Sequence, residues 1–379
     1  MNKPRQALSE FMKRSDMLLF TLSLISAIIG IIIIASAAHS YDTPRYVLVQ
    51  TASLFIGIGL FVVLTIIDID IIADKWPLLM IFSTLLFVAL LFFGEGDEVG
   101  SRSWLRAGPV GIQPSEVVRI IYIVVMAKHL SYLKEYKNLN SPISMAQLVL
   151  HFAFMFGLVI FVSSDLGSAL IFLFIFVIMM FMAGIKIYWF IVGIAAVAAA
   201  TPFIWSNVLR DYQKDRILAP YVQSIDPGGF DVRWQANQSR LALASGQLTG
   251  TGLYNGPQSQ SNAIPEKHTD FIFAVIGEEL GLIGCAVILI LLILIIIRCV
   301  YIGIKSGNTM NMLTCFGVAS MIFFQTFENI GMCMGITPVI GITLPFFSYG
   351  GSSLFSAFAA MGLVSGIKYR PKPERFRSY

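Results

Sequence analysis

Long apolar runs separated by short polar stretches make up most of the 379-residue chain. A transmembrane helix needs about 20 consecutive, mainly apolar residues, and ten segments approach or exceed that length. The pattern predicts an all-α polytopic membrane protein with a single membrane domain over 1–379. We expect about ten transmembrane helices, at 17–38, 46–67, 77–93, 114–130, 143–163, 166–184, 187–206, 270–297, 311–336 and 345–368.

Composition agrees with a membrane protein and excludes several other classes. Hydrophobic residues make up 56% of the chain and charged residues 13%, whereas a soluble domain has about 25% charged residues. A net charge of +4 is too small to indicate a nucleic-acid partner. The four cysteines form no CxxC pair, and the sequence contains no zinc-binding or Walker-type motif.

The orientation in the membrane follows from the positive charges. Ten spans place both termini on one side, and short cytoplasmic loops are enriched in Lys and Arg. Sixteen such residues lie on the side of the termini, against three in the short opposite loops. We therefore expect cytoplasmic tails at 1–16 and 369–379, and one long extracellular loop, 207–269, between spans 7 and 8. An enzyme acting outside has no ATP pool, so its natural donor is a lipid-linked substrate that arrives already activated.

Several charged residues lie inside or at the ends of these spans. Glu116 and Arg119 are three residues apart and share one helix face, so we expect them to pair, as an ion pair of structural or functional use. Asp165 is expected to cap the helix that follows it. Glu278 and Glu279 cannot both face lipid, so at least one of them points into the bundle.

The long loop re-enters the membrane at Asp270. Two interpretations of Asp270 remain open, a catalytic carboxylate or a first-turn acid favoured by the helix dipole. The loop itself combines basic residues with glycine-rich turns, which suits a pyrophosphate because Arg pairs bidentately with phosphate oxygens. An ordinary solvated loop would have the same pattern. Its basic residues include Arg210, Arg216, Arg233, Arg240 and Lys267.

Glycines and prolines are concentrated near the end of the chain, in GITPVIGITLPFFSYGGSS at 335–353. Irregular backbone at membrane depth is tolerated only where protein or a cavity covers it. This stretch, which includes Ser348 and Gly350, is therefore either the lining of a polar cavity or a tight turn between spans. Gly277 and Gly281 form a GxxxG pattern that favours close helix packing.

Five short stretches together indicate a family. They are GSRSWLRAGPVGIQPSE at 100–116, SDLGSA at 164–169, YQKDRI at 212–217, PEKHTDFIFAVIGEELG at 265–281 and NIGMCMGITPVIGITLPFFSYGGSS at 329–353. Through them the chain resembles, nearly end to end, the SEDS family of bacterial cell-wall proteins, which comprises RodA, FtsW and their sporulation relative. The resemblance implies a peptidoglycan glycosyltransferase that polymerises lipid II on the outer face of the cytoplasmic membrane, for cell-wall elongation and cell shape.

The resemblance also implies partners and site residues. The partner would be a class B penicillin-binding protein that crosslinks the strands, together with other elongation or division proteins. Asp270 matches the family's essential aspartate, and Trp104 and Glu116 match its tryptophan and glutamate. Arg119 stands where the family usually has Lys. Two further departures are Ser163-Ser164 before the DLG motif and Asn262 where division-type members carry an acid, and the latter favours the RodA-like branch.

The implied reaction joins a sugar 4-hydroxyl to the donor and releases undecaprenyl pyrophosphate. The hydroxyl needs a base, the role assigned to Asp270, and the leaving group needs positive charge. A divalent cation such as Mg²⁺ or Mn²⁺ would supply the same charge with Asp270 as its ligand. The substrate-binding candidates are Trp104, Arg102, Arg106, Arg210, Arg216, Arg233, Arg240, Lys267 and His268. The supporting candidates are Glu116, Arg119, Asp165, Glu279, Ser348 and Gly350.

Two other functions fit parts of the sequence. A flippase for lipid II would depend on polar residues in mid-span, such as Glu278, Gln325 and Glu328. A non-catalytic scaffold for a transpeptidase would tolerate Asp270→Asn. A polymerase would depend on Asp270 and on the arginines of the long loop.

Overall fold

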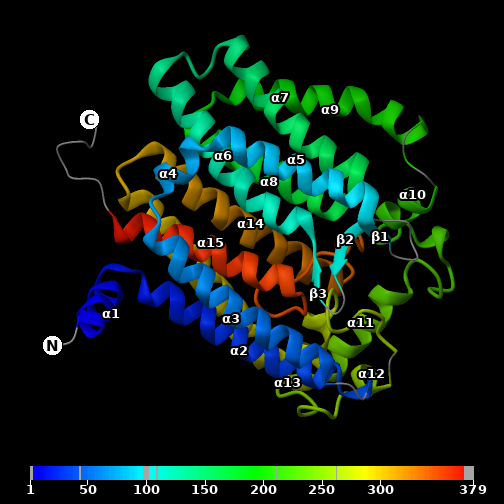
Figure 1. Cartoon of the computed structure of the whole chain (residues 1–379). Coiled ribbons are helices and arrows are strands. Elements are labelled where there is room, and N and C mark those ends of the chain that lie inside the picture. The colour runs from blue at the N-terminus through cyan, green and yellow to red at the C-terminus, as the bar shows by residue number, and fades with distance from the viewer. Residues whose placement is uncertain are drawn as a thin grey trace.

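The computed structural model describes residues 3–41, 44–96, 102–107, 110–207, 209, 211–261 and 263–370. The chain folds mostly into helices, with one small sheet (Figure 1). The helices are α1 Lys3–Arg14, α2 Met17–Ala37, α3 Arg45–Ile66, α4 Ile69–Asp74, α5 Trp76–Phe93, α6 Pro114–Tyr136, α7 Pro142–Leu158, α8 Leu166–Ala183, α9 Ile187–Asn207, α10 Asp211–Leu218, α11 Trp234–Ser245, α12 Pro257–Gln260, α13 Ile272–Lys305, α14 Thr309–Cys333 and α15 Gly351–Tyr369. The strands are β1 Gly94–Gly96, β2 Arg102–Ala107 and β3 Val110–Ile112.

Each of the ten predicted spans contains one long helix. Within the described part of the chain, eight helices are long and apolar enough to cross a membrane: α2, α3, α5, α7 with the π turn that follows it, α8, α9, α13 and α14. The other two, α6 and α15, contain more polar residues and are mostly buried. A helix enclosed by other helices meets little lipid, so its surface need not be uniformly apolar. The chain is a multi-pass membrane protein.

The most buried helices lie at the centre of the bundle. Helix α15 packs along α3, and α14 lies against both α13 and α8, with α6 beside α8 and α14. Helix α9 is peripheral and has no buried residue, as expected for a helix that faces lipid on most sides. The largest fully buried side chains include Arg119, Tyr122, Phe61, Phe87, Phe172, Lys267, Phe271, Phe347 and Phe358.

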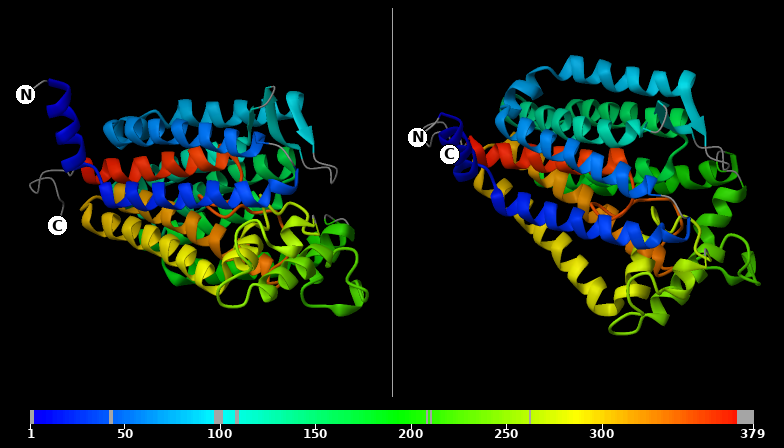
Figure 2. Two further views of the ribbon diagram at one scale, coloured as in Figure 1. Left: turned by 90° about the horizontal axis from the view of Figure 1, so that it is seen from below. Right: turned by 60° about the horizontal axis from the view of Figure 1, so that its bottom comes forward.

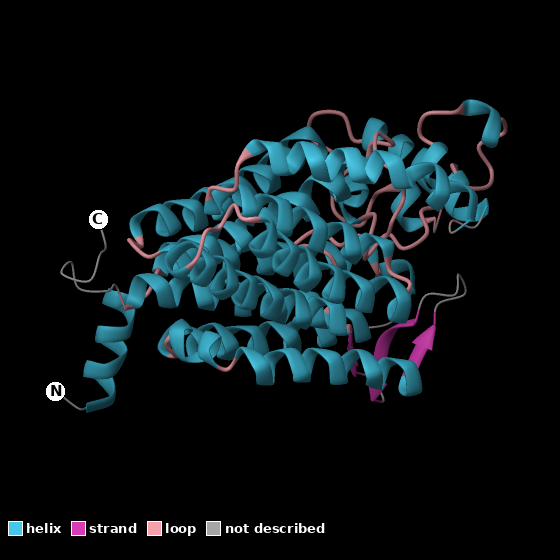
Figure 3. Ribbon diagram, turned by 90° about the horizontal axis from the view of Figure 1, so that it is seen from above, coloured by secondary structure: helices cyan, strands magenta, loops and turns pink. Residues whose placement is uncertain are grey.

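The two ends of the bundle differ in structure. Helix α1 and the end of α15 lie at one end, whereas α10, α11 and α12 lie at the other (Figure 2). The small sheet is also at this second end (Figure 3), where β2 pairs antiparallel with both β1 and β3. The predicted long loop therefore contains three helices of its own. The first helix and the end of the last helix lie at the same end of the bundle, which agrees with an even number of spans.

Helix α13 is broken at Gly281, whose φ of 67° and ψ of −166° are not helical. The backbone of 247–252 runs across the break and replaces the lost helical bonds. Leu282 N–H donates to Gln247 O at 2.9 Å, and Thr251 N–H donates to Glu278 O at 2.9 Å. The GxxxG prediction is therefore half right: Gly277 packs closely against Leu243 of α11, but Gly281 provides the break. Non-helical backbone is tolerated inside the bundle here because its N–H and C=O groups are hydrogen-bonded.

A charged cluster joins three helices at the end where the termini lie. Asp16, fully buried at the start of α2, accepts from Leu19 N–H at 2.9 Å and so caps the helix. Arg298 of α13 donates to both of its carboxylate oxygens, from Nε to Oδ1 at 3.1 Å and from Nη2 to Oδ2 at 2.7 Å. The Nζ atom of Lys368 in α15 lies 3.2 Å from Asp16 Oδ2. Arg298 and Lys368 both pair with this one buried carboxylate, so the cluster holds α2, α13 and α15 together.

Candidate functional site

Asp270 lies just outside helix α13, in a tight turn. Helix α13 begins at Ile272 with Phe271 as its N-cap, and its first turn contains no acid. The first-turn interpretation of Asp270 is therefore wrong. The turn is formed by the Glu266 carbonyl, which accepts the N–H groups of Thr269, Asp270 and Phe271 at 3.1 to 3.2 Å. Asp270 is partly exposed, as a residue that meets substrate must be.

Residues from the last third of the chain donate hydrogen bonds to the backbone on both sides of Asp270. Three consecutive carbonyls accept hydrogen bonds: His268 O from Tyr349 N–H at 2.8 Å, Thr269 O from Ser348 Oγ at 2.6 Å and Asp270 O from Asn329 Nδ2 at 2.7 Å. The same Asn329 amide also donates to Ile342 O at 2.7 Å. A side chain on a backbone held at every residue is pre-organised, which is what a catalytic group requires.

The carboxylate of Asp270 lies against the irregular segment between α14 and α15. A Cβ added at Gly341, which has a φ of 70°, would lie 3.2 Å from Asp270 Oδ2. This position therefore needs glycine for its backbone conformation as well as for space. Gln50 of α3 supports the far end of the segment by donating to Ser348 O and accepting from Gly350 N–H, both at 3.1 Å. Ser348 and Gly350 are thus placed as supporting residues.

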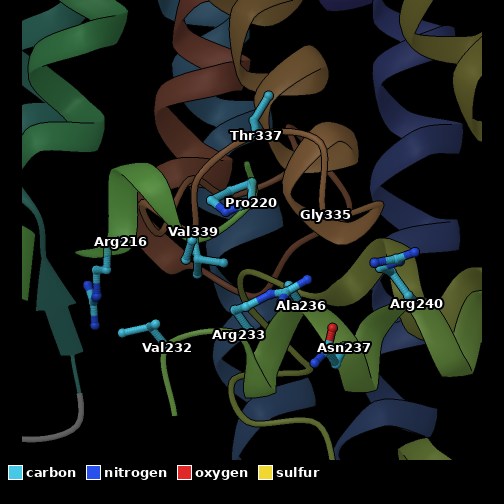
Figure 4. A pocket seen from close by; sticks show the side chains of 11 residues that line it. Arg216, Pro220, Val232, Arg233, Ala236, Asn237, Arg240, Gly335, Thr337 and Val339 are labelled. Carbon is cyan, nitrogen blue, oxygen red and sulfur yellow. The ribbon is translucent and has the colours of Figure 1, made fainter. Parts of the chain in front are cut away.

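A small hollow opens at the same end of the bundle (Figure 4). Three predicted cations line it, namely Arg216 of α10, Arg233 just before α11 and Arg240 of α11. Its other wall comes from the segment that also contacts Asp270, through Gly335, Thr337 and Val339. We call this site the arginine hollow. Its positive charge suits a phosphate or pyrophosphate group.

Asp226 shapes the loop that presents Arg233. Its carboxylate accepts four backbone N–H bonds of 2.8 to 3.2 Å, from Gly229, Phe230, Asp231 and Arg233. Burial alone would raise the pKa of Asp226, but these hydrogen bonds outweigh it and the pKa is lowered. The sequence DPGG indicated a turn here but not this role for its aspartate.

Lys267 and His268 do not line the arginine hollow. The Lys267 ammonium is fully buried and donates to Ser40 Oγ at 2.5 Å and to the carbonyl of Ser259, with the Tyr41 ring 4.7 Å away. Burial lowers its pKa to about 8, although Glu279 and Glu278 act in the opposite direction. Burial likewise lowers the pKa of His268. The predicted contact of Lys267 with phosphate finds no support in this arrangement.

Glu278 and Glu279 both point into the protein, and both are engaged. Glu278 accepts from Gln258 N–H at 2.7 Å, from Ser259 N–H at 2.8 Å and from the Ser259 hydroxyl. Glu279 accepts from Ser36 Oγ at 2.5 Å and from Gln260 Nε2 at 3.0 Å. The two acids therefore attach α12 to α13 and α2, which agrees with the supporting role predicted for Glu279.

Glu116 and Arg119 form the predicted ion pair, at 3.1 Å, and both are buried. The Arg119 guanidinium also reaches Ser168 Oγ at 3.4 Å, and that hydroxyl donates to Asp165 Oδ2 at 2.6 Å. Asp165 caps α8 by accepting from Ser168 N–H at 2.9 Å, as predicted. Gln113 Nε2 donates to the same carboxylate at 3.1 Å. This network joins α6 to α8.

The remaining predicted residues lie in or near the small sheet. Trp104 is opposite Glu95 in the sheet and packs on Gly111, where an added Cβ would lie 3.1 Å from the indole ring. Arg106 is exposed on β2, and Arg102 is the first residue of that strand. Arg210 lies outside the described residues. Among the residues that the structure describes, no group of three or more His, Cys, Asp or Glu side chains gathers to hold a metal ion.

The chain is similar to known proteins over most of its length. The FtsW/RodA/SpoVE family, described as a cell cycle protein, matches residues 16–372. Peptidoglycan glycosyltransferase MrdB of Escherichia coli (strain K12) is 35% identical over 298 residues, which cover 78% of each chain. Stage V sporulation protein E of Bacillus subtilis (strain 168) is 33% identical over 361 residues, covering 93% of this chain and 96% of that protein.

Two solved structures have a similar fold. A structure that describes the coordination of polymerization and crosslinking by a peptidoglycan synthase complex matches with a TM-score of 0.78 and 28% identity, over 93% of this chain and 97% of the other. The crystal structure of the rod shape determining protein RodA of Thermus thermophilus matches with a TM-score of 0.69 and 26% identity, over 95% of this chain and 98% of the other.

Proposed function

Since the chain belongs to the FtsW/RodA/SpoVE family, we propose that it is a peptidoglycan glycosyltransferase that polymerises lipid II. The observation that carries the proposal is the position of Asp270. Its backbone is fixed residue by residue, the residue is partly exposed, and the segment that its carboxylate contacts continues into the arginine hollow. A base and a cationic site supported by one segment are what glycosyl transfer to a hydroxyl requires.

Asp270 is the general base in this mechanism. The acceptor hydroxyl attacks the anomeric carbon of the donor, and Asp270 takes its proton. A positioned base contributes about 10²- to 10⁴-fold to rate. The fixed carbonyls of His268, Thr269 and Asp270 keep the carboxylate in place, which avoids reorganisation during the reaction.

The arginine hollow receives the pyrophosphate that leaves. Arg216 comes from α10, whereas Arg233 and Arg240 come from the N-cap and the middle of α11, and all three line the same hollow. Together they offer several donors to phosphate oxygens. Guanidinium groups pair bidentately with such oxygens, and these bonds are stronger than neutral ones. Contacts with other parts of the substrate stay a prediction for Trp104, Arg102, Arg106, Arg210 and His268, whereas the buried Lys267 is occupied by Ser40 and Ser259.

A divalent cation would bind the same pyrophosphate and take Asp270 as a ligand. Because no cluster of three side-chain ligands lies within the described residues, such a cation would need further ligands from the substrate.

The membrane topology completes the proposal. Ten spans with both termini cytoplasmic would place Asp270, the arginine hollow and 207–269 on the outer face of the cytoplasmic membrane, within one membrane domain. A lipid-linked donor presents its sugars at that surface. We further propose a class B penicillin-binding protein as partner, supported by the similarity to a synthase complex that polymerises and crosslinks, and a role in elongation.

The flippase interpretation receives less support. Such a transporter would use mid-span acids such as Glu278, but the Glu278 carboxylate is occupied by donors from α12. A scaffold would have no need for a fixed, partly exposed Asp270.

The test is polymerisation of lipid II by the purified protein, with and without a class B penicillin-binding protein. Wild type should produce glycan strands, Asp270→Asn should produce none, and both should melt at the same temperature. Asp231→Asn, which changes an exposed acid of the same loop, is the matched control and should stay active. An active Asp270→Asn variant would refute the assignment of the base. A wild type that makes no glycan under any partner condition would refute the transferase itself.

A further inference from the structure

A group of aromatic rings stands beside the Asp270 segment, and the mechanism above does not use it. Tyr46 lies 4.6 Å from His268 and 5.0 Å from Tyr349 between ring centroids, and Tyr41 lies 5.6 Å from His268. We call Tyr41, Tyr46, His268 and Tyr349 the tyrosine cluster. Tyr41 is 36% exposed, and Tyr46 and Tyr349 are only partly buried, so the cluster presents ring surface to the outside.

The tyrosine cluster and Asp270 belong to one hydrogen-bonded unit. Tyr349 N–H donates to His268 O at 2.8 Å, and His268 precedes Asp270 by two residues. A molecule resting on these rings would therefore lie next to the turn that contains Asp270. None of the four cluster residues lines the arginine hollow, which is reached from Asp270 through Gly341 and Val339. The site accordingly has two different binding surfaces, one cationic and one aromatic.

Two features of the tyrosine cluster point to a ligand. The buried Nδ1 atom of His268 has no hydrogen-bond partner among the described residues, although His268 is only 8% exposed. A buried polar atom without a partner is costly, so His268 keeps hydrogen-bonding capacity that the described protein groups do not use. The exposed Arg45 and Arg106 come from α3 and β2, and the charges of both act on the Tyr349 hydroxyl. They give the aromatic surface a positive edge.

We propose that the tyrosine cluster is the subsite for the acceptor saccharide, while the arginine hollow holds the donor pyrophosphate. This inference rests on the glycosyltransferase function proposed above. A sugar ring has C–H groups on its face and hydroxyls at its edge, which matches flat apolar rings with polar tips. Arg45 and Arg106 are placed for the acidic groups that a disaccharide peptide carries.

The two surfaces account for both substrates of the transfer. The 4-hydroxyl oxygen of the saccharide on the tyrosine cluster bonds to the anomeric carbon of the donor. The bond from that carbon to the pyrophosphate oxygen breaks, and its electron pair leaves with the pyrophosphate in the arginine hollow. The hydroxyl proton goes to Asp270, which belongs to the same unit as both surfaces.

The experiment measures binding of a lipid-free tetrasaccharide of alternating N-acetylglucosamine and N-acetylmuramic acid. The full chain carrying Asp270→Asn serves as background, so that no turnover occurs. Tyr46→Leu should raise the Kd about tenfold, the scale of one lost aromatic contact, whereas Tyr46→Phe should bind like the background. Tyr221→Leu, which removes a 66% exposed ring elsewhere in the long loop, should also leave binding unchanged. Arg216→Gln should weaken binding of inorganic pyrophosphate but not of the tetrasaccharide.

Two results would overturn the inference: no tetrasaccharide binding by the background protein, or the same Kd with Tyr46→Leu. If Tyr46→Leu does not fold, Tyr41→Leu replaces it with the same expectation, because that ring is more exposed. Failure of the proposed function looks different. In that case the wild type makes no glycan from lipid II, while tetrasaccharide binding still depends on Tyr46.

Discussion

Asn329→Ala removes one side-chain amide, and two backbone carbonyls lose their amide donor with it, while Asp270 O keeps only a long contact from Cys333 Sγ at 3.8 Å. The Asn329 amide donates to Asp270 O and to Ile342 O, each at 2.7 Å, and Asn329 is fully buried. Leaving a buried carbonyl unsatisfied costs about 1 kcal/mol at the low end, so the two together cost about 2 kcal/mol. If the whole of that cost is added to the activation free energy, because Asp270 is no longer held in place, kcat decreases about 30-fold.

The assay compares kcat for lipid II polymerisation and the melting temperature of the variant with those of a matched control. Asn311→Ala is the control, because Asn311 is also buried on α14 but does not contact the Asp270 segment. We expect a large loss of kcat for Asn329→Ala alone, with little change in KM. A variant that melts lower but polymerises at the wild-type rate would refute the idea that these bonds position the catalytic carboxylate.

Three further predictions follow from other contacts. Because burial lowers the pKa of Lys267 from 10.5 to about 8, the unfolded state binds more protons between these values, so the stability of the wild type should rise from pH 8 to 10.5. Thermal unfolding should show a smaller rise for Lys267→Met than for Lys214→Met, and equal slopes would contradict the prediction. Arg119→Met should cost about 3–5 kcal/mol because it leaves Glu116 buried without its cation, and adding Glu116→Gln should restore part of that stability; a double variant no more stable than the single one would count against the pairing. Gly281→Ala should impair folding, since an added Cβ would collide with the backbone of Gly250, whereas Gly59→Ala on α3 meets nothing within 4 Å and should be tolerated; purification yield and melting temperature decide between them.

The features predicted well are those set by local physics. Span positions follow from apolar length, because a bilayer requires it. The Glu116–Arg119 pair follows from helical spacing, and the Asp165 cap follows from the preference of short polar side chains for N-caps. Each of these depends on residues only a few positions apart.

The features that were missed depend on distant partners. Asn329 meets Asp270 across 59 positions of sequence, and no period or spacing reports such a contact. Its only local signals are its place at the start of the family stretch 329–353 and its nearness to Gln325 and Glu328 in the same helix. Lys267 resembles a phosphate ligand in sequence because a basic residue beside a catalytic motif suggests one. Its burial depends on Ser40, which lies 227 positions away.

The Asp16 cluster has a consequence for how the protein is made. Asp16 is on the first span to leave the ribosome, but its partner Arg298 follows 282 residues later. At about 5–20 residues per second, synthesis of that interval takes roughly 15–60 s. Throughout it the carboxylate lacks both of its cations, because Lys368 arrives later still. Closure of the bundle is therefore a late, post-insertion event, and a chain shortened before α15 would keep its first span but not the cluster that fixes it.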